Sequence, residues 1–245
     1  MNVLVLFSGA SSSFNEEGCL YPKNLSDVGG KPLVQVVLNH LSCLADLGAK
    51  FICVIRRDEN RSFHTGTVVR HVIPSASIIE ISSETAGAAC SALMAVDLIG
   101  TESPLVIVNG DQLLHDVDLS GVILDFQRRS LDGATIVFED FHPRWSFVKC
   151  CDDGFVTEAA EKRPISKTAT AGFYYFARGV DFVSCASAML KKGASVNNRF
   201  YICPVFNEMV LLSMRIGVYK IPKEHYHSFS TPADLQSYNE RFFRV

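Results

Sequence analysis

The sequence lacks the features of secreted, membrane-spanning and nucleic-acid-binding proteins. The N-terminus has neither the basic segment nor the small-residue cleavage site of a signal peptide, and no apolar run is long enough to cross a bilayer. The formal net charge of −3 provides no electrostatic footprint for a nucleic acid. We therefore expect a soluble, cytoplasmic protein that binds neither nucleic acid nor a membrane.

The signatures of several catalytic and metal-binding classes are also missing. There is no Gly-x-Ser-x-Gly sequence, no Walker-type sequence, and no CxxC pair or Cys/His cluster of the kind that holds zinc. The eight cysteines lie mostly in apolar runs, so we expect reduced thiols in the core. Cys150-Cys151 fits the end of a strand better than a redox or metal pair. His225-x-His227 lacks a third ligand, so we expect surface histidines there.

The composition, with 48% hydrophobic and 20% charged residues among 245, is that of a globular protein with a large core. In the first half, apolar β-branched runs at 3–7, 51–55, 77–81 and 105–108 alternate with helical patterns at 32–47, 60–70 and 86–99. This alternation predicts βαβ units around a parallel sheet, and hence an α/β protein.

The second half is predicted to contain more strands than helices. Strand-like segments lie at 134–139, 146–150, 155–159, 171–176 and 216–221, with helices at 180–192 and from residue 231. No repeat, low-complexity tract or Pro/Ser-rich linker separates the halves. We therefore predict a single domain over residues 1–245.

The first 40 residues carry the pattern of a phosphate-binding segment. An apolar strand leads into the small-residue loop Ser8-Gly9-Ala10-Ser11-Ser12-Ser13, and Lys23 and Lys31 follow before a helix. Small residues let backbone N–H groups approach an anion closely, and the lysines add full positive charge. A lysine before a helix is electrostatically unfavourable unless an anion lies near it.

A second chemical feature is Asn109-Gly110-Asp111, which follows an apolar strand. In an open parallel sheet the carboxyl ends of the strands form the ligand crevice, so Asp111 is predicted to lie at its edge. A carboxylate at this point suits Mg²⁺ that bridges phosphates. The alternative is that Asp111 only caps a turn, because Gly-Asp is also turn chemistry.

These segments occur in the order and spacing of a known family. The matching motifs are Gly9, Pro22-Lys23-Asn24-Leu25, Gly30-Lys31-Pro32-Leu33, Thr85-Ala86-Gly87-Ala88-Ala89, Asn109-Gly110-Asp111, Glu161-Lys162, 171–176 and Ser230-Thr231-Pro232. Along essentially its whole length the chain resembles the sugar-phosphate nucleotidyltransferases, or nucleoside-diphosphate-sugar pyrophosphorylases. The resemblance implies a Rossmann-like nucleotidyltransferase fold (GT-A-like), with a mostly parallel central sheet flanked by helices and a small acceptor-binding β lobe. It also implies a nucleotide-binding half over 1–115 and an acceptor-binding half over 116–245.

The same resemblance implies an activity. It is the Mg²⁺-dependent transfer of a nucleotidyl group from a nucleoside triphosphate to a sugar 1-phosphate or similar phosphorylated acceptor, with release of pyrophosphate, for cell-surface polysaccharide precursors. By resemblance, Lys23 and Asp111 are catalytic, and Asp111 binds the metal. The implied nucleotide-binding residues are Phe7, Ser8, Gly9, Ala10, Ser13, Lys23, Thr85, Gly87, Ala88 and Gly110, and the implied acceptor-binding residues are Glu161, Lys162 and Gly172.

Two departures from the family pattern bear on activity. The usual first loop reads Gly-x-Gly-Ser/Thr-Arg, but here Ser11 replaces the second glycine and Ser13 the arginine that grips the triphosphate. Pro204 stands where many members carry a second metal-binding aspartate. The candidates to replace the lost cation are Arg56, Arg57 and Arg61. Asn207, Glu208 or a water could complete the metal site, and a polar helix face is the favoured alternative for Asn207 and Glu208.

Several alternatives stay open at this stage. Without the family context, Glu161-Lys162 would be a solvated ion pair. Aromatic residues such as Trp145, Tyr174 and Tyr201 either stack on a sugar or only fill the core. The loss of the loop arginine also fits a nucleotide- or nucleotide-sugar-binding regulatory protein without turnover, whereas the motifs around Glu161 and Gly172 disfavour a glycosyltransferase. The sequence fixes neither the base nor the acceptor, and a homo-oligomer remains an option.

Overall fold

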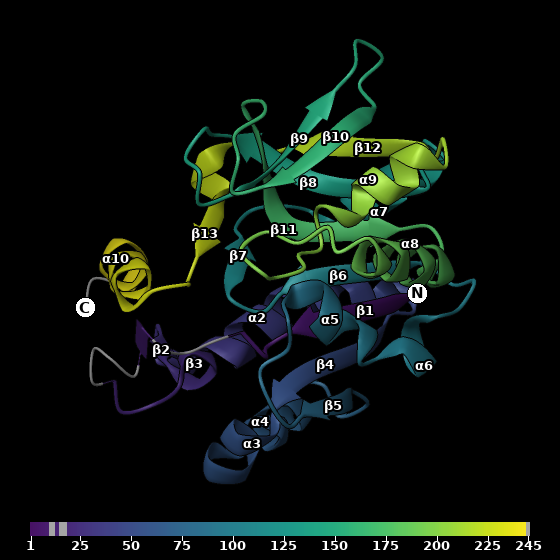
Figure 1. Ribbon diagram of the computed structural model, residues 1–245. Coiled ribbons are helices and arrows are strands. Elements are labelled where there is room, and N and C mark those ends of the chain that lie inside the picture. Colours follow the sequence, from purple (N-terminus) through teal and green to yellow (C-terminus); the bar gives the residue numbers. More distant parts are fainter. Residues whose placement is uncertain (10–12, 15–18, 244–245) are drawn as a thin grey trace.

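The computed structural model of the chain describes residues 1–9, 13–14 and 19–243. Ala10, an implied nucleotide-binding residue, lies outside the described residues, as does Ser11. One sheet of nine strands organises the molecule, with a main path β10-β9-β11-β6-β1-β4-β5 and with β8 and β12 continuing from β11 (Figure 1). The strands are β1 (Asn2–Leu6), β4 (Lys50–Arg56), β5 (Ser77–Ile81), β6 (Leu105–Asn109), β8 (Gly133–Glu139), β9 (Ser146–Cys150), β10 (Val156–Glu161), β11 (Thr168–Phe176) and β12 (Ile216–Lys220).

The two halves of the chain contribute differently to this sheet. In the first half β1 pairs in parallel with β4 and β6, and β4 with β5, as the alternating pattern predicted. Strand β11 of the second half joins the sheet antiparallel to β6 and β8, and its register with β8 shifts between Thr170 and Tyr174. The β9–β10 hairpin projects away from the parallel strands, at the top of Figure 1. The predicted fold class is therefore confirmed.

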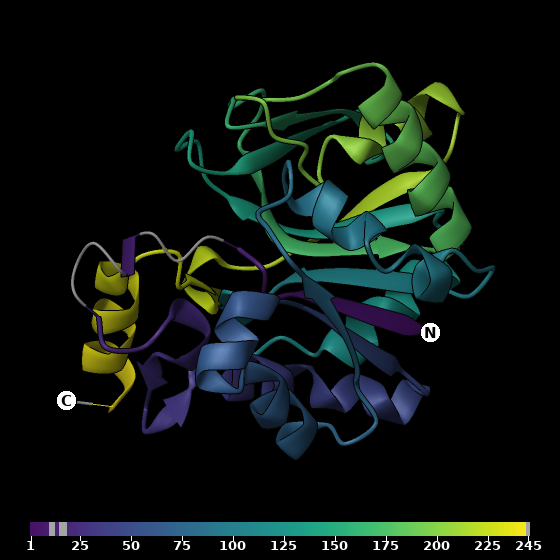
Figure 2. The same cartoon turned by 60° about the horizontal axis from the view of Figure 1, so that its bottom comes forward.

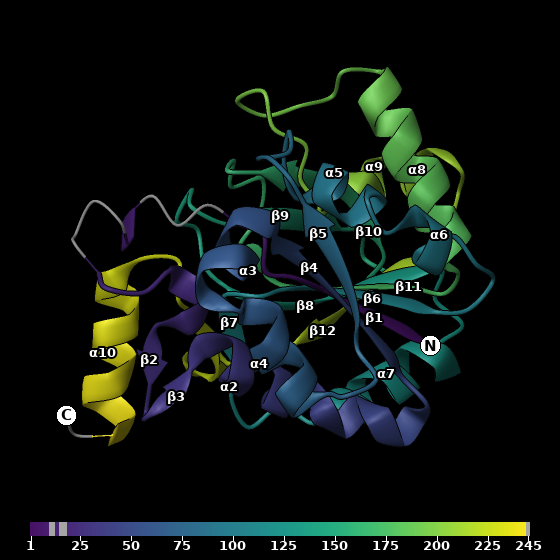
Figure 3. The same cartoon turned by 90° about the horizontal axis from the view of Figure 1, so that it is seen from below.

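Helices cover both faces of the sheet because strand side chains alternate between the faces. Val3 and Val5 of β1 belong to one apolar core, and Leu4 and Leu6 to the other. The first core lies under α2 (Leu33–Leu41), α4 (Thr65–Val72) and α7 (Leu119–Arg128), and the second under α5 (Ala88–Leu93), α6 (Val96–Ile99), α8 (Gly179–Lys191) and α9 (Val205–Leu211), as Figure 3 shows. Among the described helices, none has the length and apolarity that a membrane crossing requires.

The last helix, α10 (Pro232–Phe243), lies beside an N-terminal segment that is distant in sequence (Figure 2). Asn239 of α10 accepts a hydrogen bond from the Gly29 N–H at 3.1 Å and donates one to the Asp27 carbonyl at 2.9 Å. Two small sheets complete this region: β2 (Asp27–Val28) with β3 (Lys31–Pro32), and β7 (Gln112–Leu114) with β13 (Tyr226–Ser228).

Three segments that were each predicted as one helix are divided in the structure. In the 32–47 segment α2 ends at Leu41, and a 3₁₀-helix η2 (Ser42–Leu47) continues to left-handed Gly48. The 60–70 segment is divided between α3 (Arg57–Phe63) and α4, because His64 has a left-handed backbone with φ of 56°. The 86–99 segment likewise forms two short helices, α5 and α6. Helix α7 was not predicted at all.

The cysteine and histidine predictions also need correction. All eight thiols are free, but Cys19, Cys43 and Cys151 are exposed, so the expectation of core thiols is wrong for them. His227 packs against the rings of Tyr238 and Phe242 instead of lying free at the surface. Burial lowers its pKa to about 4, with nearby charged Arg241 and the neighbouring histidines acting in the same direction.

Candidate functional site

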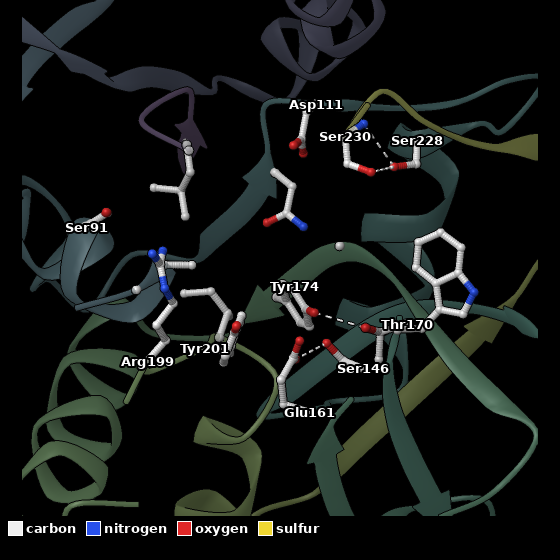
Figure 4. A pocket seen from close by; sticks show the side chains of 18 of the residues that line it. Ser91, Asp111, Ser146, Glu161, Thr170, Tyr174, Arg199, Tyr201, Ser228 and Ser230 are labelled. Carbon is white, nitrogen blue, oxygen red and sulfur yellow. Dashed lines mark hydrogen bonds between the residues drawn. The ribbon is translucent and has the colours of Figure 1, made fainter. Parts of the chain in front are cut away.

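A cavity of about 430 Å³ opens where the carboxyl ends of β1 and β6 meet the strands of the second half (Figure 4). This is the position that an open parallel sheet offers to a ligand. Nine of the predicted site residues line the cavity: Ser8, Gly9, Thr85, Gly87, Ala88, Asp111, Glu161, Lys162 and Gly172. The fold thus brings together segments that lie far apart in the sequence and come from both halves of the chain.

Four predicted site residues do not line this cavity: Phe7, Ser13, Lys23 and Gly110. The Phe7 ring lies in the core, and Gly110 packs directly against it, because a Cβ on Gly110 would lie 2.4 Å from Phe7 Cδ1. Ser13 is half-buried.

Lys23 and Asp111 form an ion pair at the segment that was predicted to bind phosphates. Lys23 begins the 3₁₀-helix η1 (Lys23–Leu25), and its Nζ lies 2.7 Å from Asp111 Oδ2. The Lys23 side chain is buried, whereas Asp111 borders the cavity. The ammonium also lies beneath Gly9, where a Cβ would come within 3.2 Å of Nζ. The loop backbone, the cation and the carboxylate therefore meet at one place.

A buried polar network holds η1 in position. Asn24 Nδ2 donates to the Phe7 carbonyl at 2.7 Å and to Glu59 Oε1 at 2.9 Å. Thr65 Oγ1 donates to the same carboxylate at 2.8 Å. Burial raises the pKa of Glu59, although the hydrogen bonds from Asn24 and Thr65 oppose that shift. Because each partner is fixed by another, Lys23 is pre-positioned next to Asp111.

Gly87 allows two chain segments to meet at the wall of the cavity. Its backbone has a φ of +119°, and a Cβ at this position would lie 2.4 Å from the Phe200 carbonyl oxygen. The Ala89 N–H donates to that oxygen at 3.0 Å, and the Phe200 N–H donates to the Ala86 carbonyl at 2.7 Å. Only glycine combines this conformation with this close approach.

The other end of the cavity contains a buried carboxylate. Glu161 is only 8% exposed and accepts a hydrogen bond from Ser146, as Figure 4 shows. Burial raises its pKa, and the Ser146 hydrogen bond and the Lys162 charge only partly offset this effect. The alternative of a solvated Glu161–Lys162 pair is therefore wrong. Lys162 is exposed, with Nζ 5.5 Å from the centroid of the Tyr201 ring.

Gly172 lies in the irregular stretch of β11, with a φ of +63°. A Cβ there would come within 2.1 Å of Gln112 Oε1 and 2.5 Å of Asn109 Nδ2. The amide of Gln112 in turn donates to the Ala171 carbonyl. Gly172 therefore lets β11 close against the strand end that presents Asp111.

Two cationic residues of the cavity were not identified from the sequence. Arg144 stacks on Trp145, with its guanidinium carbon 4.0 Å from the ring centroid, and pairs with Asp234 at 3.6 Å. Arg199 reaches the cavity from the connection between α8 and α9. No local motif marks either residue. In contrast, Arg56, Arg57 and Arg61 do not line this cavity, and Arg56 and Arg57 pair with Asp58 and Glu80.

The candidates for a second metal ligand have structural roles instead. Asn207 bonds the backbone of Ala159 twice, at 2.8 Å each, and Glu208 pairs with Lys192 at 2.6 Å. Within the described part of the chain, no group of three or more His, Cys, Asp or Glu side chains is arranged to hold a metal. Asp111 is a single carboxylate, which is the protein contribution that suffices for Mg²⁺ bound mainly by substrate phosphates.

No protein-family model and no curated protein matches the sequence, but solved structures match the fold closely. A nucleoside-diphosphate-sugar pyrophosphorylase from Vibrio cholerae RC9 has a TM-score of 0.83 at 21% identity, over 97% of this chain and 99% of that one. A UDP-glucose pyrophosphorylase complexed with UDP-glucose has a TM-score of 0.76 at 16% identity, over 99% and 98%. The inositol-1-phosphate CTP transferase from T. maritima has a TM-score of 0.72 at 17% identity, over 98% and 96%.

These likenesses define the class of fold. The chain has the fold of the sugar-phosphate nucleotidyltransferases, and its predicted motifs border the cavity at the carboxyl ends of the strands. Its structural neighbours are nucleoside-diphosphate-sugar pyrophosphorylases and related sugar-1-phosphate nucleotidyltransferases, as the sequence resemblance predicted.

Proposed function

We propose that this protein transfers a nucleotidyl group from a nucleoside triphosphate to a sugar 1-phosphate, or to a similar phosphorylated acceptor, and releases pyrophosphate. The observation that carries the proposal is the shared cavity, which has Asp111, paired with the buried Lys23 behind it, at one end and buried Glu161 at the other. One ligand is bound by the first half of the chain and the other by the second half. The product would serve as a precursor for polysaccharide synthesis.

The phosphate end supplies charge without a protein nucleophile. Lys23 lies beneath Gly9, so its ammonium can stabilise negative charge that grows on a phosphate held by the loop backbone. The network around Asn24 fixes this lysine before the substrate binds. Preorganised charge of this kind costs no rearrangement during the reaction.

Asp111 would hold Mg²⁺, which would neutralise charge on the triphosphate when bound. The carboxylate faces the cavity and already neutralises Lys23. Such a metal would take most of its remaining oxygen ligands from the substrate and water, because no group of three or more His, Cys, Asp or Glu side chains among the described residues is arranged to hold a metal.

The acceptor end has groups that fit a sugar phosphate. Glu161 and the hydroxyls of Ser146 and Thr170 offer hydrogen-bond partners to sugar hydroxyls. Lys162 and Arg144 supply positive charge for the acceptor phosphate. These groups surround one space, so they can orient the acceptor oxygen toward the phosphate end.

A second candidate function is binding of a nucleotide or nucleotide sugar without turnover. The specific observation is that the first 22 residues contain neither lysine nor arginine, so the first loop has no cation of its own. Of the residues considered as metal ligands, Asp111 remains the candidate. Pro204 has no ligating side chain, and Asn207 and Glu208 are engaged in other contacts. Such a protein would bind a triphosphate and form no product.

One experiment distinguishes these functions. Purified protein is incubated with Mg²⁺, a panel of nucleoside triphosphates and a panel of sugar 1-phosphates, and pyrophosphate release and calorimetric binding are both measured. Pyrophosphate that depends on both substrates supports the transferase. Triphosphate binding without pyrophosphate release supports the binding protein. If neither binding nor release is seen with any pair, both proposals fail.

A further inference from the structure

A half-exposed ion pair lies on the cavity wall. Glu84 Oε2 lies 3.6 Å from a terminal nitrogen of Arg199, and both residues line the cavity. Their side chains are 48% and 47% exposed. A half-exposed pair at this separation contributes little to stability, so either partner can exchange its contact for a ligand.

The pair belongs to two segments that the backbone locks together. The hydrogen bonds between Phe200 and Ala86 and between Ala89 and Phe200 fix the residue after Arg199 against the segment that follows Glu84. The close approach at Gly87 leaves no room for a shift between the segments. Glu84 and Arg199 are therefore held side by side near the N-terminus of α5.

The charge of Glu84 indicates which part of a nucleotide this wall suits. Glu84 beside Arg199 would repel a triphosphate, whereas the Asp111 carboxylate beside Lys23 is the one proposed to hold Mg²⁺, which would offset such repulsion. Figure 4 shows the Arg199 guanidinium pointing into the cavity on the side of Ser91, away from Asp111. A group with donors and acceptors along one edge fits this wall better than an anion.

We propose that Glu84 and Arg199 read the hydrogen-bonding edge of the nucleotide base and select cytosine or guanine over uracil or thymine. This inference rests on the proposed nucleotide binding. A guanidinium presents two parallel donors and a carboxylate two acceptors. Cytosine places two acceptors beside one amino donor, and guanine places two donors beside one carbonyl, so each complements the pair. Uracil and thymine alternate acceptor, donor and acceptor, and this order leaves one member of the pair mismatched.

The structural neighbours are consistent with base choice residing in such local residues. One neighbour is a UDP-glucose pyrophosphorylase and another is a CTP transferase, although their TM-scores to this chain are similar, at 0.76 and 0.72. The shared fold therefore does not determine which nucleotide base such a protein binds. Discrimination has to come from side chains on the wall that the base contacts.

The test is calorimetric titration of the full chain with CTP, GTP, UTP and dTTP, in Mg²⁺ and without acceptor. We expect CTP or GTP to bind at least about 10-fold more tightly than UTP and dTTP, as for a matched bidentate contact. In each of the variants Arg199→Met and Glu84→Gln, the dissociation constants for these two groups of triphosphates should differ by no more than about 3-fold. Glu139→Gln and Lys167→Met are the control variants, because this pair has the same 3.6 Å separation, is 77% exposed and lies outside the cavity.

The outcomes separate this inference from the proposed function. Equal binding of all four triphosphates, tighter binding of UTP or dTTP, or an unchanged ratio in both variants overturns the base-reading role but not nucleotide binding. Failure of the unmodified protein to bind any triphosphate overturns both. Thermal unfolding without ligand confirms that the half-exposed substitutions leave the fold intact.

Discussion

Lys23 and Asp111, 88 positions apart in the chain, form an ion pair of 2.7 Å across the ends of neighbouring strands. Lys23 comes from the segment after β1, and Asp111 follows β6, which pairs with β1 in parallel. The pair joins the segment proposed to bind phosphates to the carboxylate proposed to hold the metal. Its buried lysine and cavity-facing aspartate are the basis of the first prediction.

Replacing Lys23 by methionine should lower kcat by about 100-fold or more, because the cation that stabilises charge on the transferred phosphate is removed. Lys50→Met is the matched control, since Lys50 is an exposed residue at the start of β4. Steady-state pyrophosphate release measures both. A Lys23→Met variant as active as the control would contradict the role of this lysine.

Introducing an arginine at Ser13 should raise kcat/KM by about 10-fold or more, because it would give the first loop the cation found in the nucleotidyltransferase pattern that the loop resembles. Ser13→Met has a comparable length without the charge and serves as the control. Pyrophosphate release is compared at limiting triphosphate. Equal rates for the two variants would show that the loop cation is not what limits this protein.

Gly172→Ala should destabilise the protein by about 2–4 kcal/mol. Two costs add together: the added Cβ is unfavourable in a left-handed backbone conformation, and it clashes with the Gln112 side chain. Gly154→Ala separates the two costs, because Gly154 has a φ of +80° but no atom within 4 Å of the added Cβ. This control should cost about 1 kcal/mol. Denaturant unfolding gives both values, and similar losses would argue against the close approach at Gly172.

Asp140→Asn should destabilise the fold at neutral pH by about 2 kcal/mol. Burial alone would raise the pKa of this carboxyl, but Lys223 and the N–H groups of His142, Phe141 and Trp145 outweigh burial and hold it well below its ordinary value. The carboxylate therefore stabilises the fold above pH 3.8, and this contribution is lost as the pH falls further.

The measurement is the free energy of unfolding of wild type and Asp140→Asn as a function of pH. The difference between them should shrink below pH 3.8. Asp153→Asn, in the exposed turn between β9 and β10, is the control and should show no such difference. A gap between wild type and Asp140→Asn that stays constant down to low pH would contradict the depressed pKa.

The sequence patterns predicted most strands well because buried strands have a simple signature. Segment 77–81 corresponds to β5 and 146–150 to β9 without change. The helices were predicted less well, because left-handed His64 interrupts a continuous apolar pattern. Helix α7 was missed although Leu119, Val122, Ile123 and Phe126 have helical spacing and are buried.

The candidate site was partly predictable for a geometric reason. Parallel strands end at one edge, so Gly9 and Asp111 could be brought together from the order of elements alone. Arg144 and Arg199 could not, because they lie on connections whose positions depend on long-range contacts such as Arg144 with Asp234. No local sequence motif distinguishes these two residues from arginines at the surface.

The most direct test of the account is pyrophosphate release by wild type and Asp111→Asn, with Mg²⁺, a nucleoside triphosphate and a sugar 1-phosphate. The account predicts release by the wild-type protein that requires Mg²⁺ and both substrates, and a loss of about 100-fold or more in the variant. Release that is unaffected by Asp111→Asn, or no release with any substrate pair, would contradict nucleotidyl transfer at this site.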